Sequence, residues 1–157
     1  SGPCVDVRTD ALRRLGPDAD ASRLSIEAPF DLDGDGHADA YVSDPSFCGT
    51  GGCTWELYVS RGACGIHVLE VFAVYPTAAS THSHGLADLG VTMKNGCAGL
   101  ARTELTLSFD GTRYVPVRQR DCECPALVDD NGATVDPPTN PDATCSAWGP
   151  ARMKALP

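Results

Sequence analysis

The sequence predicts an all-β protein: an antiparallel sandwich or rolled meander with one short N-terminal helix and an irregular, disulfide-tethered C-terminal arm. Three observations support this class. From residue 24 onward, short apolar segments rich in strand-forming residues alternate with turn residues. Eight cysteines occur without a C-x-x-C pair, which is typical of disulfides in an oxidising compartment. Half of the 12 prolines follow residue 124, where apolar periodicity is lost.

The only helix that the sequence predicts lies within residues 4–16. Asp6 and Thr9 are capping residues, and Gly16-Pro17 ends the helix-favouring segment. The expected strands are residues 24–28, 39–43, 54–60, 65–75, 86–93, 100–109 and 113–118. Asp110-Gly111 between the last two is a strong hairpin signal.

Residues 54–60 alternate regularly between two faces. We expect Trp55, Leu57 and Val59 to pack in the core, because alternate side chains of a strand point the same way. If the opposite face were exposed, Tyr58 could form a binding patch with Tyr41.

The chain divides into a β domain, residues 1–124, and a Pro-rich arm, residues 125–157. The arm cannot form a core of its own. Cys145 and Trp148 are costly residues to leave in a disordered tail, which favours an arm docked on this domain or on a neighbouring copy of it.

The cysteine spacings fit disulfides better than zinc, which prefers two C-x-x-C pairs. Residues as close as Cys48 and Cys53, around a Gly-rich turn, are natural partners. The expected bonds are Cys48–Cys53, Cys64–Cys97, and bonds from Cys4 and Cys145 to the pair Cys122 and Cys124.

Composition excludes several function classes. The 157 residues suit one domain, and the net charge of −9 disfavours nucleic acid and anionic membranes as partners. No apolar run approaches the ~20 residues of a membrane helix. The chain begins in polar sequence, which we interpret as a processed or trimmed protein.

The most informative segment is residues 31–39, in which four aspartates alternate with glycines and one histidine. Such carboxylates would repel one another unless a cation gathers them. Calcium takes six to eight oxygen ligands, and Gly34 and Gly36 allow the tight wrap that this requires. The expected Ca²⁺ ligands are Asp31, Asp33, Asp35, the backbone carbonyl of His37, and Asp39.

The loop is not an EF-hand. Val42 occupies the position where an EF-hand has its bidentate glutamate, and Pro29 precedes the loop where a helix would be needed. We therefore expect a calcium loop between two strands.

The run from Asp31 to Asp44 resembles the calcium loop of the FG-GAP and VCBS-type repeats of extracellular proteins, in which an Asp-rich turn leads into a strand. A single copy argues against their β-propeller. Residues 26–117 are also similar to a group of small exported bacterial proteins of unassigned function. This resemblance rests on residues 48–53, 84–89 and 107–114 and implies a compact β domain in or outside the cell envelope.

Two further segments could carry chemistry. His82 and His84 could bind a transition metal or, with Asp88, act in a hydrolase, although their surroundings are typical of a loop with exposed histidines. Residues 49–52 could cradle a phosphate, but they precede a strand and lack the P-loop lysine, so a stapled turn is favoured.

The expected function is a non-enzymatic, calcium-binding structural or adhesive module, secreted or at the bacterial cell surface or periplasm. It could self-assemble through its strand edges or its C-terminal arm. The alternative is an envelope binding module that recognises a glycan or a basic protein, as lysozyme inhibitors do.

Overall fold

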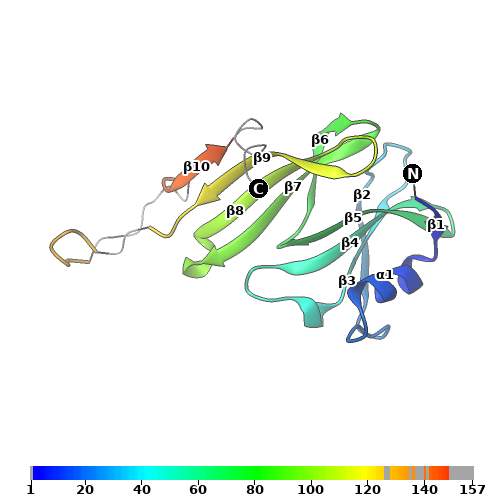
Figure 1. Cartoon of the computed structure of the whole chain (residues 1–157), viewed down its shortest axis with the longest axis horizontal. Helices are drawn as coiled ribbons and strands as arrows, with labels where there is room; N and C mark the ends of the chain where they lie inside the picture. Colours follow the sequence, from blue (N-terminus) through cyan, green and yellow to red (C-terminus); the bar gives the residue numbers. More distant parts are fainter. Residues whose placement is uncertain (1, 126–127, 135, 137–139, 141, 149–157) are drawn as a thin grey trace.

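The computed structural model describes residues 2–125, 128–134, 136, 140 and 142–148 as two antiparallel sheets (Figure 1). The first sheet has the order β1-β5-β4-β3-β2 and the second the order β10-β9-β8-β7-β6. The strands of the first are β1 (Cys4–Val5), β2 (Ser25–Phe30), β3 (Asp39–Ser43), β4 (Cys53–Arg61) and β5 (Cys64–Ala73). Those of the second are β6 (Thr77–Ser83), β7 (Leu86–Gly96), β8 (Ala101–Phe109), β9 (Tyr114–Cys122) and β10 (Cys145–Trp148). The predicted all-β class is confirmed.

One hydrophobic core joins the sheets. Tyr41, Trp55 and Leu57 come from the first sheet, and Leu89 and Leu107 from the second, all nearly or fully buried. Residues directly opposite in a ladder share a face, as Leu89 and Leu107 do. The predicted core role of residues 55, 57 and 59 is confirmed.

Helix α1 (Val7–Leu15) covers the other face of the first sheet. Asp6 caps it by accepting the Thr9 N–H at 2.8 Å, and Gly16, at φ 95°, follows its last residue. The helix begins later than residue 4, because Cys4 and Val5 pair with β5 instead. Tyr58 is fully buried under α1, and Tyr41 lies in the other core, so the prediction of a shared binding patch is wrong.

Strands β6 and β10 lie where we expected loop or arm. β6 is rich in small and polar residues and therefore lacks the alternation that marks a half-buried strand. Two short 3₁₀ turns, Pro45–Phe47 and Cys97–Gly99, complete the described secondary structure.

Four disulfides involve all eight cysteines: Cys4–Cys64, Cys48–Cys53, Cys97–Cys124 and Cys122–Cys145. The expected Cys48–Cys53 bond and the link from Cys145 to the Cys122/Cys124 pair are confirmed. The expected Cys64–Cys97 bond and the link from Cys4 to that pair are wrong. The physical reason is that β1 lies beside β5, which places Cys4 at Cys64 and leaves Cys97 to Cys124.

This cysteine usage indicates an oxidising environment. Within the described ranges, no helix has the length and apolar character needed to cross a membrane.

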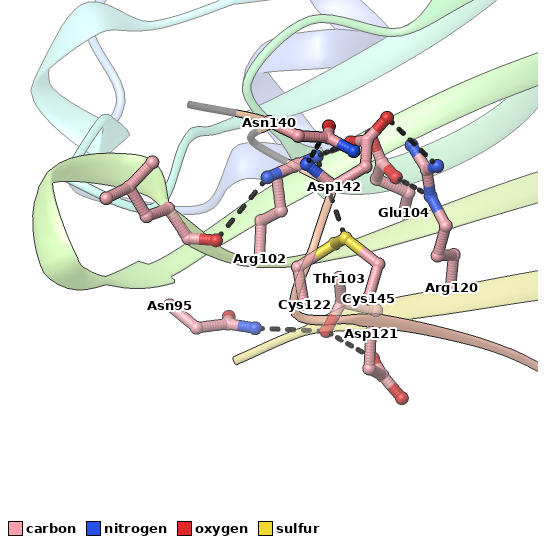
Figure 2. Close-up of polar contacts among 11 residues, drawn as sticks. Asn95, Arg102, Thr103, Glu104, Arg120, Asp121, Cys122, Asn140, Asp142 and Cys145 are labelled. Carbon is pink, nitrogen blue, oxygen red and sulfur yellow. Dashed lines mark hydrogen bonds and ion pairs between the residues drawn. A yellow bond between two sulfur atoms is a disulfide. The ribbon is translucent and has the colours of Figure 1, made fainter. Parts of the chain in front are cut away.

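The described part of the C-terminal arm is held on the same chain. β10 pairs with β9, with Cys145 opposite Cys122 and Trp148 opposite Gln119. Figure 2 shows the Cys122–Cys145 bond next to a network of charged side chains. Arg102 reaches Asp142 at 2.7 Å, and Arg120 reaches it at 3.5 Å. Both arginines also contact Glu104, so the arm is fixed by a covalent bond, a strand ladder and ion pairs.

Candidate metal centre

The Asp-rich loop connects β2 to β3, where Phe30 and Asp39 close the strand pair. Gly34 and Gly36 have φ values of 74° and 90°, which side chains other than glycine rarely adopt. The two glycines therefore do what the sequence predicts: they let the backbone turn tightly back toward Asp31.

Three predicted ligands converge. The carboxylate oxygens of Asp31, Asp33 and Asp39 lie within 4.8 Å of one another. In the part of the chain that the structure describes, no other group of three or more His, Cys, Asp or Glu side chains is positioned to share one ion. Oxygen-only ligands of this kind suit a hard divalent cation.

Asp39 forms the buried base of the site and is fully inaccessible to solvent. Its two oxygens accept the backbone N–H groups of Leu32, at 2.6 Å, and Ser60, at 2.7 Å. Burial raises the pKa of Asp39; the two hydrogen bonds oppose this rise, and the neighbouring Asp33 and Asp31 add to it. A cation would relieve the repulsion from those two neighbours.

Asp31 holds the loop closed. Its carboxylate accepts the N–H groups of Gly36 and Gly34, both at 2.8 Å, and of Asp35 at 3.2 Å. The bond from Gly36 is the main cause of its lowered pKa, and those from Gly34 and Asp35 contribute. Asp31 is therefore held as a carboxylate.

Asp33 meets a positive charge that sequence reasoning missed. Arg61, at the end of β4, places its Nη1 atom 2.7 Å from Asp33 and 3.6 Å from Asp35. The two partners are far apart in sequence, and only the order of the strands brings them together. One guanidinium balances one of the four aspartates, so the loop keeps an excess of negative charge.

The other two expected ligands lie at the periphery. The Asp35 carboxylate is outside the group of three and accepts the N–H of His37 at 2.8 Å. The His37 side chain is 81% exposed, which agrees with a role for its backbone alone. Val42, at the position of the missing glutamate, is buried in strand β3, as expected for a loop between strands.

The loop also contributes to the core and to the junction of the sheets. The Leu32 side chain is fully buried in the main core. The Leu32 carbonyl accepts the N–H of Ala87 on β7 at 2.7 Å. One residue between Asp31 and Asp33 therefore connects both sheets.

The candidate hydrolase residues do not form a relay. His82 Nδ1 lies 3.2 Å from the Ser80 carbonyl, and His84 Nδ1 lies 2.9 Å from the Phe109 carbonyl. Asp88 accepts the Ser83 hydroxyl at 2.8 Å, and neither histidine has a hydrogen bond to it within the described ranges. His84 also sits in the β6–β7 turn at φ 49°, so the two histidines do not share a strand face.

Residues 49–52 form a turn in which Gly49 and Gly52 pair with each other, flanked by the Cys48–Cys53 bond. This is the stapled turn that the sequence favours.

A buried Glu56–His67 contact also escaped prediction. Glu56, fully buried on β4, lies 2.6 Å from Nε2 of His67 on β5. Burial raises the pKa of Glu56, and the hydrogen bond from His67 opposes this. In sequence, Glu56 differs in no way from a solvent-facing residue of an alternating strand.

Comparison with protein-family models, curated proteins and solved structures finds no match to this chain.

Proposed function

We propose that this chain is a non-enzymatic, calcium-binding structural module that works outside the cytoplasm, at the bacterial cell surface, in the periplasm or as a secreted protein. One observation carries the proposal: Asp31, Asp33 and Asp39 converge on a loop whose glycines allow the wrap that an ion requires. Asp35 and the His37 carbonyl complete the proposed ligand set.

The position of the loop supports a structural role for the ion. Asp39 ties the loop to β4 through Ser60, and Leu32 ties it to β7 through Ala87. A cation that orders the three carboxylates would therefore stabilise the junction of the two sheets. At a dissociation constant of ~10⁻⁵ M, millimolar Ca²⁺ outside the cell would stabilise the fold by roughly 2.7 kcal/mol.

Thermal unfolding in 1 mM CaCl₂ and in EGTA tests this role. We expect calcium to raise the melting temperature by several degrees, because the ion binds the folded loop and not the unfolded chain. Asp31→Asn should remove most of that difference between the two buffers.

The matched control is Asp110→Asn. Asp110 is also a turn aspartate, accepting the N–H groups of Thr112 and Arg113, but it lies outside the three-carboxylate group. This variant should keep the full response to calcium. Equal melting curves of the wild-type protein in both buffers would refute the structural role.

The alternative function, an envelope module that binds a glycan or a basic protein, has one supporting observation. A cavity of about 350 Å³ opens beside the loop and includes Asp33 and Arg61 in its lining. A glycan array and a pull-down on basic lysozymes, each with and without Ca²⁺, would show whether such a partner exists.

A further inference from the structure

The cavity beside the metal loop lies between the two sheets. Its apolar wall is formed by Val59, Ile66 and Val68 of the first sheet and by Leu86 and Phe109 of the second. The space between packed sheets is normally filled by side chains at close-packed density. A hollow with apolar walls forfeits those contacts, and its volume falls in the ~300–1,000 Å³ range of small-molecule sites.

Arg61 gives this cavity a specific polar group. The one hydrogen bond that its guanidinium donates to described residues runs from Nη1 to the Ser60 carbonyl, at 2.8 Å. The same atom makes the 2.7 Å contact with Asp33. Nε and Nη2 therefore donate no hydrogen bond within the described ranges. This edge of the guanidinium can bind a carboxylate through two parallel hydrogen bonds.

His84 lines the cavity from the opposite sheet. Its Nδ1 donates to the Phe109 carbonyl at 2.9 Å, because a carbonyl only accepts, so the ring is oriented and Nε2 can donate to a carboxylate when the ring carries both protons. An arginine edge and an imidazole above apolar walls suit a small organic acid: a carboxylate on an apolar body.

The metal loop and the cavity share Asp33 and Arg61. A cation bound to Asp33 would compete with the guanidinium for the same carboxylate and neutralise the negative charge that repels an anionic ligand. Both effects have the same sign, so each ligand should strengthen the binding of the other by an equal factor.

We propose that this cavity binds a small organic carboxylate through Arg61 and His84, and that this ligand and Ca²⁺ bind cooperatively. The cooperativity rests on the proposed calcium function. The contact between the carboxylate and Arg61 does not.

The test is calorimetric titration of the whole chain with sodium benzoate, in 1 mM CaCl₂ and in EGTA. We expect saturable binding that is several-fold tighter with calcium. Sodium acetate, which lacks the apolar body, should bind more weakly. Arg61→Gln should abolish benzoate binding, whereas Arg113→Gln, an exposed arginine outside the cavity lining, should leave it unchanged.

Arg61→Gln has a second expected effect that a merely structural residue would not show. Removing the competing positive charge should tighten Ca²⁺ binding several-fold, measured without benzoate. His84→Asn, which keeps a residue tolerant of the left-handed turn, should weaken benzoate several-fold and leave Ca²⁺ binding alone.

The outcomes separate the two proposals. Failure of the wild-type chain to bind Ca²⁺ overturns the calcium function. Normal Ca²⁺ binding with no saturable benzoate binding, or with equal binding by Arg61→Gln, overturns the carboxylate site and leaves the calcium function standing. Circular dichroism of both variants confirms that they fold.

Discussion

Asp10 is a buried carboxylate on α1 whose charge is balanced by three donors. Arg14 Nε lies at 2.6 Å, Arg13 Nη2 at 2.5 Å, and the Tyr58 hydroxyl donates at 3.0 Å. Burial alone would raise the pKa of Asp10, but the hydrogen bonds from Arg14, Arg13 and Tyr58 outweigh it and lower the pKa to about 2.

This shift makes stability depend on acid pH. The folded pKa lies below the ordinary aspartate value of 3.8, so the charged form contributes stability above about pH 4. This stability is lost as the pH falls toward 2. The contribution is about 2 kcal/mol. In urea unfolding at pH 5, the free energy of unfolding of the wild-type protein should exceed that of Asp10→Asn by this amount. The difference should shrink toward zero at pH 2. A constant difference would contradict this assignment.

Asp39 supports the fold even without an ion, because it satisfies the backbone N–H groups of Leu32 and Ser60. Asp39→Ala leaves both without their acceptor and should cost roughly 2–4 kcal/mol in EGTA. Asp39→Asn keeps one acceptor oxygen and should cost less. Urea unfolding in EGTA measures the free energy of unfolding of both variants. Equal stability of Asp39→Ala and the wild-type protein would contradict this role and show that water replaces the carboxylate.

Single residues were predictable where the spacing itself carries the chemistry. The aspartates and glycines of residues 31–39 cluster within nine positions, so the convergence of Asp31, Asp33 and Asp39 could be foreseen from sequence, whereas the peripheral place of Asp35 could not. The contacts of Arg61 and Ser60 with the loop could not be foreseen, because these residues reach it only through the pairing of β3 with β4.

At the scale of elements, strand β10 is joined to β9 by a strand ladder and by the Cys122–Cys145 bond, and we expect the bond to be the main anchor. In the entropic model this bond contributes about 3 kcal/mol against unfolding. The double variant Cys122→Ser/Cys145→Ser should release β10 while the other strands persist. Limited proteolysis should then cut within residues 125–145 much faster than in the wild-type protein.

The ion pairs of Asp142 are the competing anchor for the arm (Figure 2). Unchanged proteolysis of the double cysteine variant would mean that these pairs and the strand ladder suffice. Asp142→Ala on the oxidised chain is the matched control and should have a small effect, because partly exposed ion pairs contribute ~1 kcal/mol or less.

Elements with strong alternation, such as β4, were predictable to within a residue or two of their ends. β6 was not, because its side chains are small and mostly exposed, and nothing in its pattern distinguishes a strand from a loop. β10 contacts the rest of the sheet through a covalent bond and an ion pair to residues far away in sequence, and no local pattern encodes these.

At the scale of the whole molecule, the disulfide framework depends on topology. Only the Cys48–Cys53 bond is local; the Cys4–Cys64 bond spans 60 positions and follows from β1 joining the sheet beside β5. Many pairings of eight cysteines are compatible with the sequence, and sheet order selects among them.

The expected self-association remains a prediction, and the placement of the C-terminal arm determines which kind of assembly we expect. Because β10 pairs with β9 of its own chain and is linked to it covalently, exchange of the arm would create a disulfide between chains. We expect a single monomer band on non-reducing gels, with any assembly reversible and non-covalent. Disulfide-linked dimers that vanish on reduction would show that the arm pairs between copies.

The most direct test of the account is the stoichiometry of calcium binding, measured by equilibrium dialysis of the whole chain. We expect one Ca²⁺ per chain for the wild-type protein and for Asp110→Asn, and a loss of that ion in Asp31→Asn/Asp33→Asn. No bound calcium at millimolar concentration, or an equal amount in the double variant, would contradict the claim that this loop is a calcium site.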